Sequence, residues 1–196
     1  MAKLFADLLS DIYDITKRPD LVAETKLAIR MATLKAHHSD FYPRDIAESG
    51  LTWVTPAYTQ SLEFKNVFPN FRALKYIRKI SSGVPGEFFT VITPEQVLDS
   101  YRRDRNNVCY MAGRMIEIKS NSLDSDMIVG YYADPDVTES GYSSWVADNA
   151  DHVIIMEAAA VIFKMIGFDE QASMFAKLTE LNLMELKTNY LSAVGY

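Results

Sequence analysis

The residue types that most often carry chemistry are sparse in this chain. His37 and His38, followed by Asp40, offer imidazole and carboxylate ligands for a metal ion. Neighbouring side chains on a helix point about 100° apart, however, so two adjacent histidines rarely reach one ion. We expect both histidines at the C-terminus of a helix instead, where His38 packs and His37 pairs near the negative end of the helix dipole.

A cysteine nucleophile is a second possibility, in which Cys109 would pair with the distant His37 or His38. Cys109 stands in an alternating run typical of a strand, without an activating neighbour, and this favours a structural thiol. As the single cysteine, it excludes an intrachain disulfide and a multi-cysteine zinc site. It also favours synthesis in a reducing compartment such as a cytoplasm.

Two charged clusters are the remaining candidates. A basic cluster could meet phosphates in a nucleic-acid-binding module, but Asp104 interrupts it and few aromatic residues accompany it, so a solvated or salt-bridging face is favoured. Its members are Arg72, Lys75, Arg78, Lys79, Arg102, Arg103 and Arg105. Asp134, Asp136 and Glu139 lack the glycine and distal glutamate of a calcium loop, and Asp134-Pro135 predicts a turn.

The sequence contains no P-loop, no G-x-G-x-x-G, no G-x-S-x-G, no H-E-x-x-H and no C-x-x-C motif. We therefore expect neither an enzyme nor a bound cofactor. The net charge of −6 is uneven: residues 51–120 carry 10 basic and 6 acidic groups, and residues 121–196 carry 3 and 12. The acidic last third argues against a primarily duplex-binding protein. Charges also interrupt every apolar run, so no membrane role is expected.

Hydrophobic periodicity predicts an α+β protein, mainly α. Helices are expected from the N-terminus to about Thr16 and over residues 19–38, the second with a buried stripe of Leu27, Met31 and Leu34. Residues 50–137 alternate as strands do, with Phe71–Ile80 favoured as a strand. Ala112-Gly113 predicts a hairpin turn, residues 81–86 an exposed loop, and Thr93-Pro94 the start of one short helix.

The last third returns to helical spacing. Residues 149–166 are apolar nearly all round and predict a central buried helix, followed by Gly167 as its cap and Asp169 as the N-cap of a helix to about Ser192. The final helix has two apolar faces, of which one would cover the core. The other would either be buried against the β-rich subdomain or need a partner chain. One face holds Met174, Leu178 and Leu181, and the other Leu183, Leu186, Tyr190 and Val194.

These elements predict a helical body of residues 1–49 and 143–196 around an inserted antiparallel β-rich subdomain of residues 50–142. The block TKRPDLVAETKLAIRMATLKAHHSDFYPRDI, residues 16–46, resembles the N-terminal signature of the structural adaptor proteins of tailed bacteriophages. In such proteins a helical pair is followed by a strand-rich insertion and then by C-terminal helices. Residues 68–80 and 145–190 fall where that order of elements predicts them.

The resemblance implies a structural virion protein that is synthesised in the bacterial host cytoplasm and lies at the portal vertex, in a ring that is usually dodecameric. Its expected partners are the portal protein and tail or nozzle proteins, and double-stranded DNA would pass through its channel without specific binding. It also implies that a C-terminal segment docks on the portal, which we assign to Tyr190, Leu191, Val194 and Tyr196. We expect Leu183 and Leu186 to contact neighbouring subunits. The alternatives are a nucleic-acid-binding module that uses the basic middle region and a small cysteine-dependent enzyme.

Overall fold

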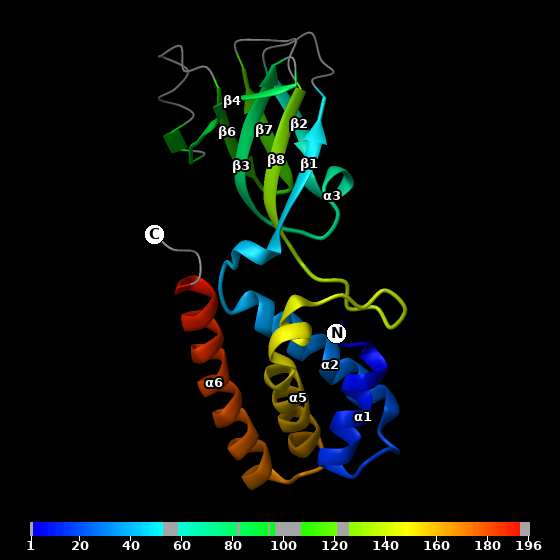
Figure 1. Ribbon diagram of the computed structural model, residues 1–196. Coiled ribbons are helices and arrows are strands. Elements are labelled where there is room, and N and C mark those ends of the chain that lie inside the picture. Colours follow the sequence, from blue (N-terminus) through cyan, green and yellow to red (C-terminus); the bar gives the residue numbers. More distant parts are fainter. Residues whose placement is uncertain are drawn as a thin grey trace. The chain divides into compact units, whose positions relative to one another are not determined.

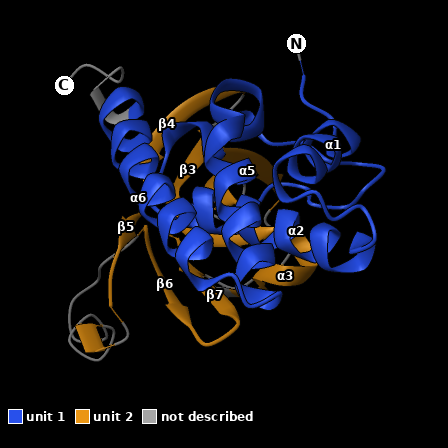
Figure 2. Ribbon diagram, turned by 90° about the horizontal axis from the view of Figure 1, so that it is seen from below, with its two compact units in different colours: residues 1–45, 134–196 blue, residues 46–133 orange. Residues whose placement is uncertain are grey.

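The structure, a computed structural model, describes residues 2–52, 59–81, 83–93, 95–96, 107–120 and 126–192. The chain forms two compact units, residues 1–45 with 134–196 and residues 46–133 (Figures 1 and 2). The first contains the long helices and the second the sheets, which confirms the expected α+β class. The chain crosses between the units at 45/46 and 133/134, whereas the expected boundaries were at 49/50 and 142/143.

The helical unit is built around one central helix. It contains α1 (Phe5–Thr16), α2 (Val22–His38), a 3-10 turn (Pro43–Asp45), α5 (Trp145–Met165) and α6 (Asp169–Ser192). Figure 1 shows α5 between α6 on one side and α1 and α2 on the other. Buried side chains of α5 point in every direction around the helix, which confirms the prediction of a central buried helix. Ser144 caps its N-terminus by accepting the Ala147 N–H, and Gly167 ends it at a positive φ of 82°.

The buried face of α2 is opposite to the one that side-chain size suggested. Leu27 and Met31 are 54% and 53% exposed, whereas Ala28, Ala32 and Ala36 lie in the core. The core side of α5 is also rich in alanine, and small side chains let two helices pack closely. The prediction of a buried stripe at Leu27, Met31 and Leu34 was therefore wrong, because it ranked apolar residues by size.

The second unit consists of two four-stranded sheets. One has the order β1-β8-β3-β4 and the other β2-β7-β6-β5, and all pairs are antiparallel except β5 with β6. The strands and a short helix are β1 (Ile46–Leu51), β2 (Thr59–Glu63), α3 (Phe64–Val67), β3 (Phe71–Ser81), β4 (Val84–Phe88), β5 (Thr90–Val91), β6 (Val108–Ala112), β7 (Met115–Lys119) and β8 (Asp126–Ala133). Side chains of both sheets share one core, with Ile77, Val129, Ile116 and Ile118 at its centre.

Most local predictions for this unit hold. The expected strand at Phe71–Ile80 is β3, and the turn after Ala112 joins β6 to β7 with Gly113 at a φ of 59°. The expected loop over residues 81–86 was too long, because β4 begins at Val84 and pairs with β3 as a hairpin. The backbone N–H of Thr93 donates to the Gln96 side chain at 3.2 Å, as a capping box does; Pro94 lies outside the described residues.

Candidate functional site

The two apolar faces predicted for α6 are both present, and only one is covered. Leu186 is 3% exposed and lies in the core of the helical unit, with Leu183 packed beside it. Tyr190 packs there too, with its ring 4.9 Å from the ring of Trp145 and beneath the Arg44 guanidinium at 4.8 Å. Leu186, which was expected to contact a neighbouring subunit, is thus covered by its own chain, whereas Leu183 and Tyr190 are covered only in part.

The opposite face of α6 is left in water, and we call it the α6 stripe. Its residues are Met174, Leu178, Leu181 and Met184, which are 52%, 37%, 62% and 64% exposed. Their spacing of four, three and three residues places them on one side of the helix, about half a turn from Leu186. Single exposed apolar residues are ordinary, but an aligned set on one helix face forms a larger apolar patch, a kind of surface that in many proteins is an interaction site.

The predicted portal-docking segment is described only in part. Tyr190 belongs to the packed face of α6, and Leu191 lies in its last turn. The side chain of Leu191, and Val194 and Tyr196 altogether, lie outside the described residues. Docking by these residues stays a prediction.

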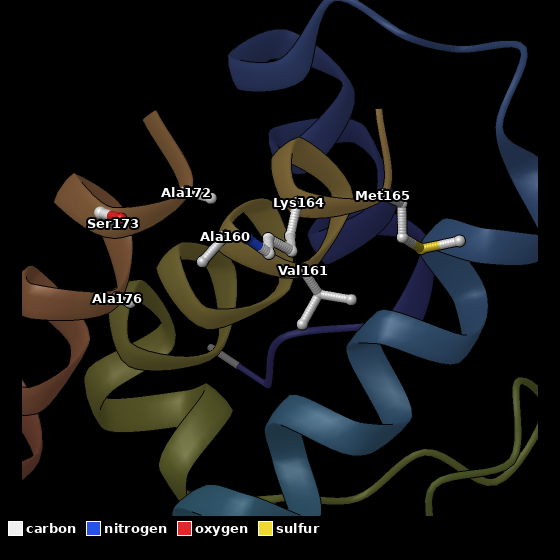
Figure 3. Close-up of a pocket in the computed structure, with 7 residues that line it drawn as sticks. All are labelled: Ala160, Val161, Lys164, Met165, Ala172, Ser173 and Ala176. Carbon is white, nitrogen blue, oxygen red and sulfur yellow. The ribbon is translucent and has the colours of Figure 1, made fainter. Parts of the chain in front are cut away.

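A recess of about 390 Å³ lies between α5 and α6, near the α5–α6 turn (Figure 3). Its floor consists of small side chains, which leave space between the helices, and Val161 and Met165 form an apolar side. At its rim the Lys164 amine pairs with Asp169. Such a recess suits an apolar side chain of a neighbouring molecule rather than a polar substrate. The small residues that line it are Ala160, Ala172, Ser173 and Ala176.

The two histidines exchange the roles that the sequence suggested. His37 is 2% exposed and lies between Asp45, 2.7 Å from Nδ1, and Ser144, 2.9 Å from Nε2. His38 is on the surface, with Nε2 2.6 Å from Asp134. The expectation that His38 packs was wrong, because the small buried residues of α2 turn His37 inward.

Each histidine contacts an aspartate at a point where the chain passes from one unit to the other. Asp45 is the last residue of the helical unit before the sheets, and Asp134 is the first after them. Asp45 also accepts the indole N–H of Trp145 at 2.7 Å. Consecutive side chains at the end of α2 therefore fix both crossing points to the helical unit. Asp45, Ser144 and Trp145 were not predicted from the sequence as members of a cluster, although a serine just before a long apolar run is an N-cap signal.

Ser144, His37 and Asp45 have the connectivity of a catalytic triad. If the Nδ1 proton is donated to Asp45, Nε2 is left to accept the Ser144 hydroxyl proton, as a general base would. Ser144 is only 4% exposed, however, and its oxygen already accepts the Ala147 N–H. A substrate carbonyl has no route to that oxygen in this conformation, so we interpret the three residues as a structural clamp.

Cys109 does not meet either histidine, because it lies in the core of the other unit. It is fully buried, and burial raises the pKa of its thiol to about 12. A thiol in such an apolar environment stays protonated at neutral pH and reacts slowly.

The basic residues of β3 already have partners. Arg72 and Lys75 lie 5.5 and 5.6 Å from the centre of the Tyr132 ring, as cation–π contacts do. Lys79 is 9% exposed, and burial lowers the pKa of its amine despite the nearby Glu87. These contacts favour structural roles over phosphate binding. Arg102, Arg103 and Arg105 lie outside the described residues.

Within the described residues, no group of three or more histidine, cysteine, aspartate or glutamate side chains is placed to hold a metal ion. Asp134 and Glu139 diverge, one to His38 and the other to Lys26. Asp136 accepts the Thr138 N–H at 2.8 Å, which fixes a tight turn. Nor does the described part of the chain contain a helix of the length and apolar character that crossing a membrane requires.

No protein-family model matches the chain, and no curated protein matches it. The features that bear on its function are therefore the surfaces described above and the resemblance of residues 16–46.

Proposed function

We propose that this chain is a structural subunit of a tailed-phage particle, an adaptor whose ring connects the portal of the head to the tail. It would help to retain and channel the DNA and would contact the portal protein on one side and tail or nozzle proteins on the other. The resemblance of residues 16–46 supports this role, a location at the portal vertex, and a ring of about twelve copies, the number usual for such adaptors.

The observation that carries the proposal is the α6 stripe. Burying apolar surface gains roughly 25 cal/mol per Å², so a folded chain that leaves four aligned leucine and methionine side chains in water can gain stability by association. A ring subunit needs such a surface, whereas a monomer does not. Ser144 and Cys109 are both buried, so neither is placed to attack a substrate as a nucleophile.

The charge distribution fits a channel wall. Residues 121–196 carry 12 acidic and 3 basic groups, and they include α5 and α6. Acidic walls release no counterions when a duplex passes, so DNA gains nothing by adhering to them. DNA would therefore move through the ring without specific binding.

The proposal is tested by native mass spectrometry of the purified chain, alone and with portal rings from the same virus. We expect self-association or binding to the portal ring, and at least a tenfold loss of it in Leu181→Glu. Ser10→Glu, which adds the same charge on an exposed position of α1, is the matched control and should associate normally. A chain that stays monomeric at high concentration and never joins portal rings would contradict the proposal.

A further inference from the structure

A second pocket lies between α5 and α6, and its lining is polar where that of the first recess is apolar. It has a volume of about 370 Å³ and shares no lining residue with that recess. It lies where α5 is kinked, at Ala150, whose φ and ψ are −150° and 48°. Ala150 and Leu186 are buried and give the pocket an apolar base. The other residues that line it are Asn149, His152, Asn182, Glu185, Asn189 and Tyr190.

The polar side chains of this pocket come from two neighbouring helices. Asn149 and His152 are three residues apart on α5. On α6, Asn182, Glu185 and Asn189 are three and four residues apart, a spacing that puts side chains on one face of a helix. All of them line the same space, so groups from both helices can bind one ligand together.

Much of the hydrogen-bonding capacity of these side chains is not used within the described part of the chain. There, His152, Glu185 and Asn189 have no hydrogen-bond or ion-pair partner. A carboxylate and an amide oxygen accept hydrogen bonds, as does one nitrogen of a neutral imidazole. Each of the three residues can therefore accept a hydrogen bond from a ligand.

The other two asparagines use their amide nitrogens rather than their amide oxygens. Asn149 Nδ2 donates to the carbonyl oxygen of Trp145 at 2.7 Å, and Asn182 Nδ2 donates to the sulfur of Met156 at 3.3 Å. Neither amide oxygen has a partner among the described residues. The pocket thus offers several acceptors and suits a ligand that is rich in donors.

The charge of the lining favours a cation. Among the described residues that line the pocket, Glu185 is the only aspartate, glutamate, lysine or arginine. Two cations lie near but outside the lining. The Arg44 guanidinium stacks on the Tyr190 ring at 4.8 Å, and Lys187 is two residues after Glu185, about 200° further round α6. The helical unit as a whole carries 10 basic and 17 acidic groups, so its net field attracts cations and repels anions.

We propose that this pocket binds a primary alkylammonium group. An ammonium head has three N–H donors and no acceptor, which matches one carboxylate surrounded by amide oxygens. Glu185 neutralises its charge, and the asparagine oxygens accept its other protons. The alkyl chain lies on Ala150 and Leu186, as lysine stems do on apolar surface. A free polyamine and a lysine side chain of another polypeptide both carry this chemistry. The inference goes beyond the proposed function and does not depend on it, because a single chain supplies every residue of the pocket.

Titration of the isotope-labelled full chain with spermidine and with Nα-acetyl-lysine methylamide, followed by NMR, tests the site. We expect saturable shifts of the asparagine side-chain signals with a Kd of about 1 mM or tighter, the range of a small ligand with one charged contact. Salt should weaken the binding, since it screens exposed charges. Nα-acetyl-norleucine methylamide, which lacks the amine, should not bind. Tighter binding of spermidine assigns the site to a free polyamine, and tighter binding of the lysine derivative assigns it to a lysine side chain.

Variants separate this site from general attraction of amines to an acidic protein. Glu185→Gln keeps the size of the side chain and removes its charge, so it should weaken binding at least about tenfold. Glu180→Gln removes the same charge from an exposed position outside the pocket and is the matched control, which should bind as the native chain does. Asn189→Asp adds a second carboxylate to the lining and should tighten binding several-fold, a gain that a purely structural role would not produce.

Three results would overturn the inference. Neither amine gives saturable shifts; or the norleucine derivative binds as well as the lysine derivative, which would make the pocket merely apolar; or Glu185→Gln and Glu180→Gln bind alike, which would show attraction by the net charge of the unit. None of these results bears on the proposed function, which is decided by native mass spectrometry with portal rings.

Discussion

The adjacent histidines of α2 provide a controlled experiment on burial. Asp45 and Asp134 each accept a histidine contact at nearly the same length, 2.7 and 2.6 Å. The buried pair has side chains 2% and 1% exposed, and the surface pair 46% and 31%. We predict that Asp45→Ala and Asp134→Ala differ strongly in their effect on the stability of the helical unit.

The expected loss in the free energy of unfolding depends on which donors lose their acceptor. Asp45→Ala removes the partner of the buried His37 ring, whose Nδ1–H donates to it in the tautomer considered above, and the acceptor of the part-buried indole N–H of Trp145. An unsatisfied buried donor costs about 1–3 kcal/mol, so the free energy of unfolding should fall by roughly 3 kcal/mol or more. Asp134→Ala breaks an exposed pair, which is worth about 0–1 kcal/mol, and water replaces the lost carboxylate.

Urea denaturation followed by far-UV circular dichroism measures this difference, because most of the helix signal comes from the unit that holds both pairs. Asp45→Asn is the milder change, since both contacts are made to the same oxygen, Oδ1, and an amide oxygen in that place can still accept them. Equal losses in the two alanine variants, or a loss below about 1 kcal/mol in Asp45→Ala, would refute the assignment of the buried cluster as a clamp.

Three further measurements test packing in both units. Cys109 should be unreactive towards thiol reagents at neutral pH in the folded chain and should react fully in denaturant. Fast labelling of the native protein would instead support the alternative of a cysteine-dependent enzyme. Gly130→Ala should lower the free energy of unfolding by about 1–3 kcal/mol, and with it the midpoint of thermal unfolding, because a Cβ there would overlap the Tyr76 ring. An unchanged midpoint would contradict that packing. Ala32→Leu should cost about 1–3 kcal/mol in urea denaturation and Met31→Ala less than 1; the reverse order would restore the buried face inferred from side-chain size.

Periodicity predicted the elements well, because it reports which residues share a side of a helix or strand. The central helix α5 and the β6–β7 hairpin were found on this basis. Periodicity did not say which side of α2 is buried, since alanines and the larger apolar residues both repeat at helical spacing. That choice depends on how closely α2 approaches α5, a tertiary quantity that no window of sequence contains.

The histidine network was missed for a related reason. His37 and Asp45 are eight residues apart, but Ser144 and Trp145 are 107 and 100 residues from their partners. No local pattern links them, because the sheet unit is inserted between the two halves of the helical unit. The triad-like connectivity then becomes visible only in three dimensions, and burial decides that it stabilises rather than catalyses.

The exposed apolar residues of α2 and the small buried ones bear on the proposed function together. Burial of apolar surface stabilises a fold, which favours large apolar side chains on the inner face of a helix. On α2, however, alanines lie inside together with Ile29, while Leu27 and Met31 are about half exposed, and α6 likewise keeps Leu181 and Met184 in water. The alanines allow tight packing of α2 within the unit. Under the proposed function, a neighbouring chain would cover the exposed side chains, and the same helices would then contribute to one core inside the chain and to a second between copies.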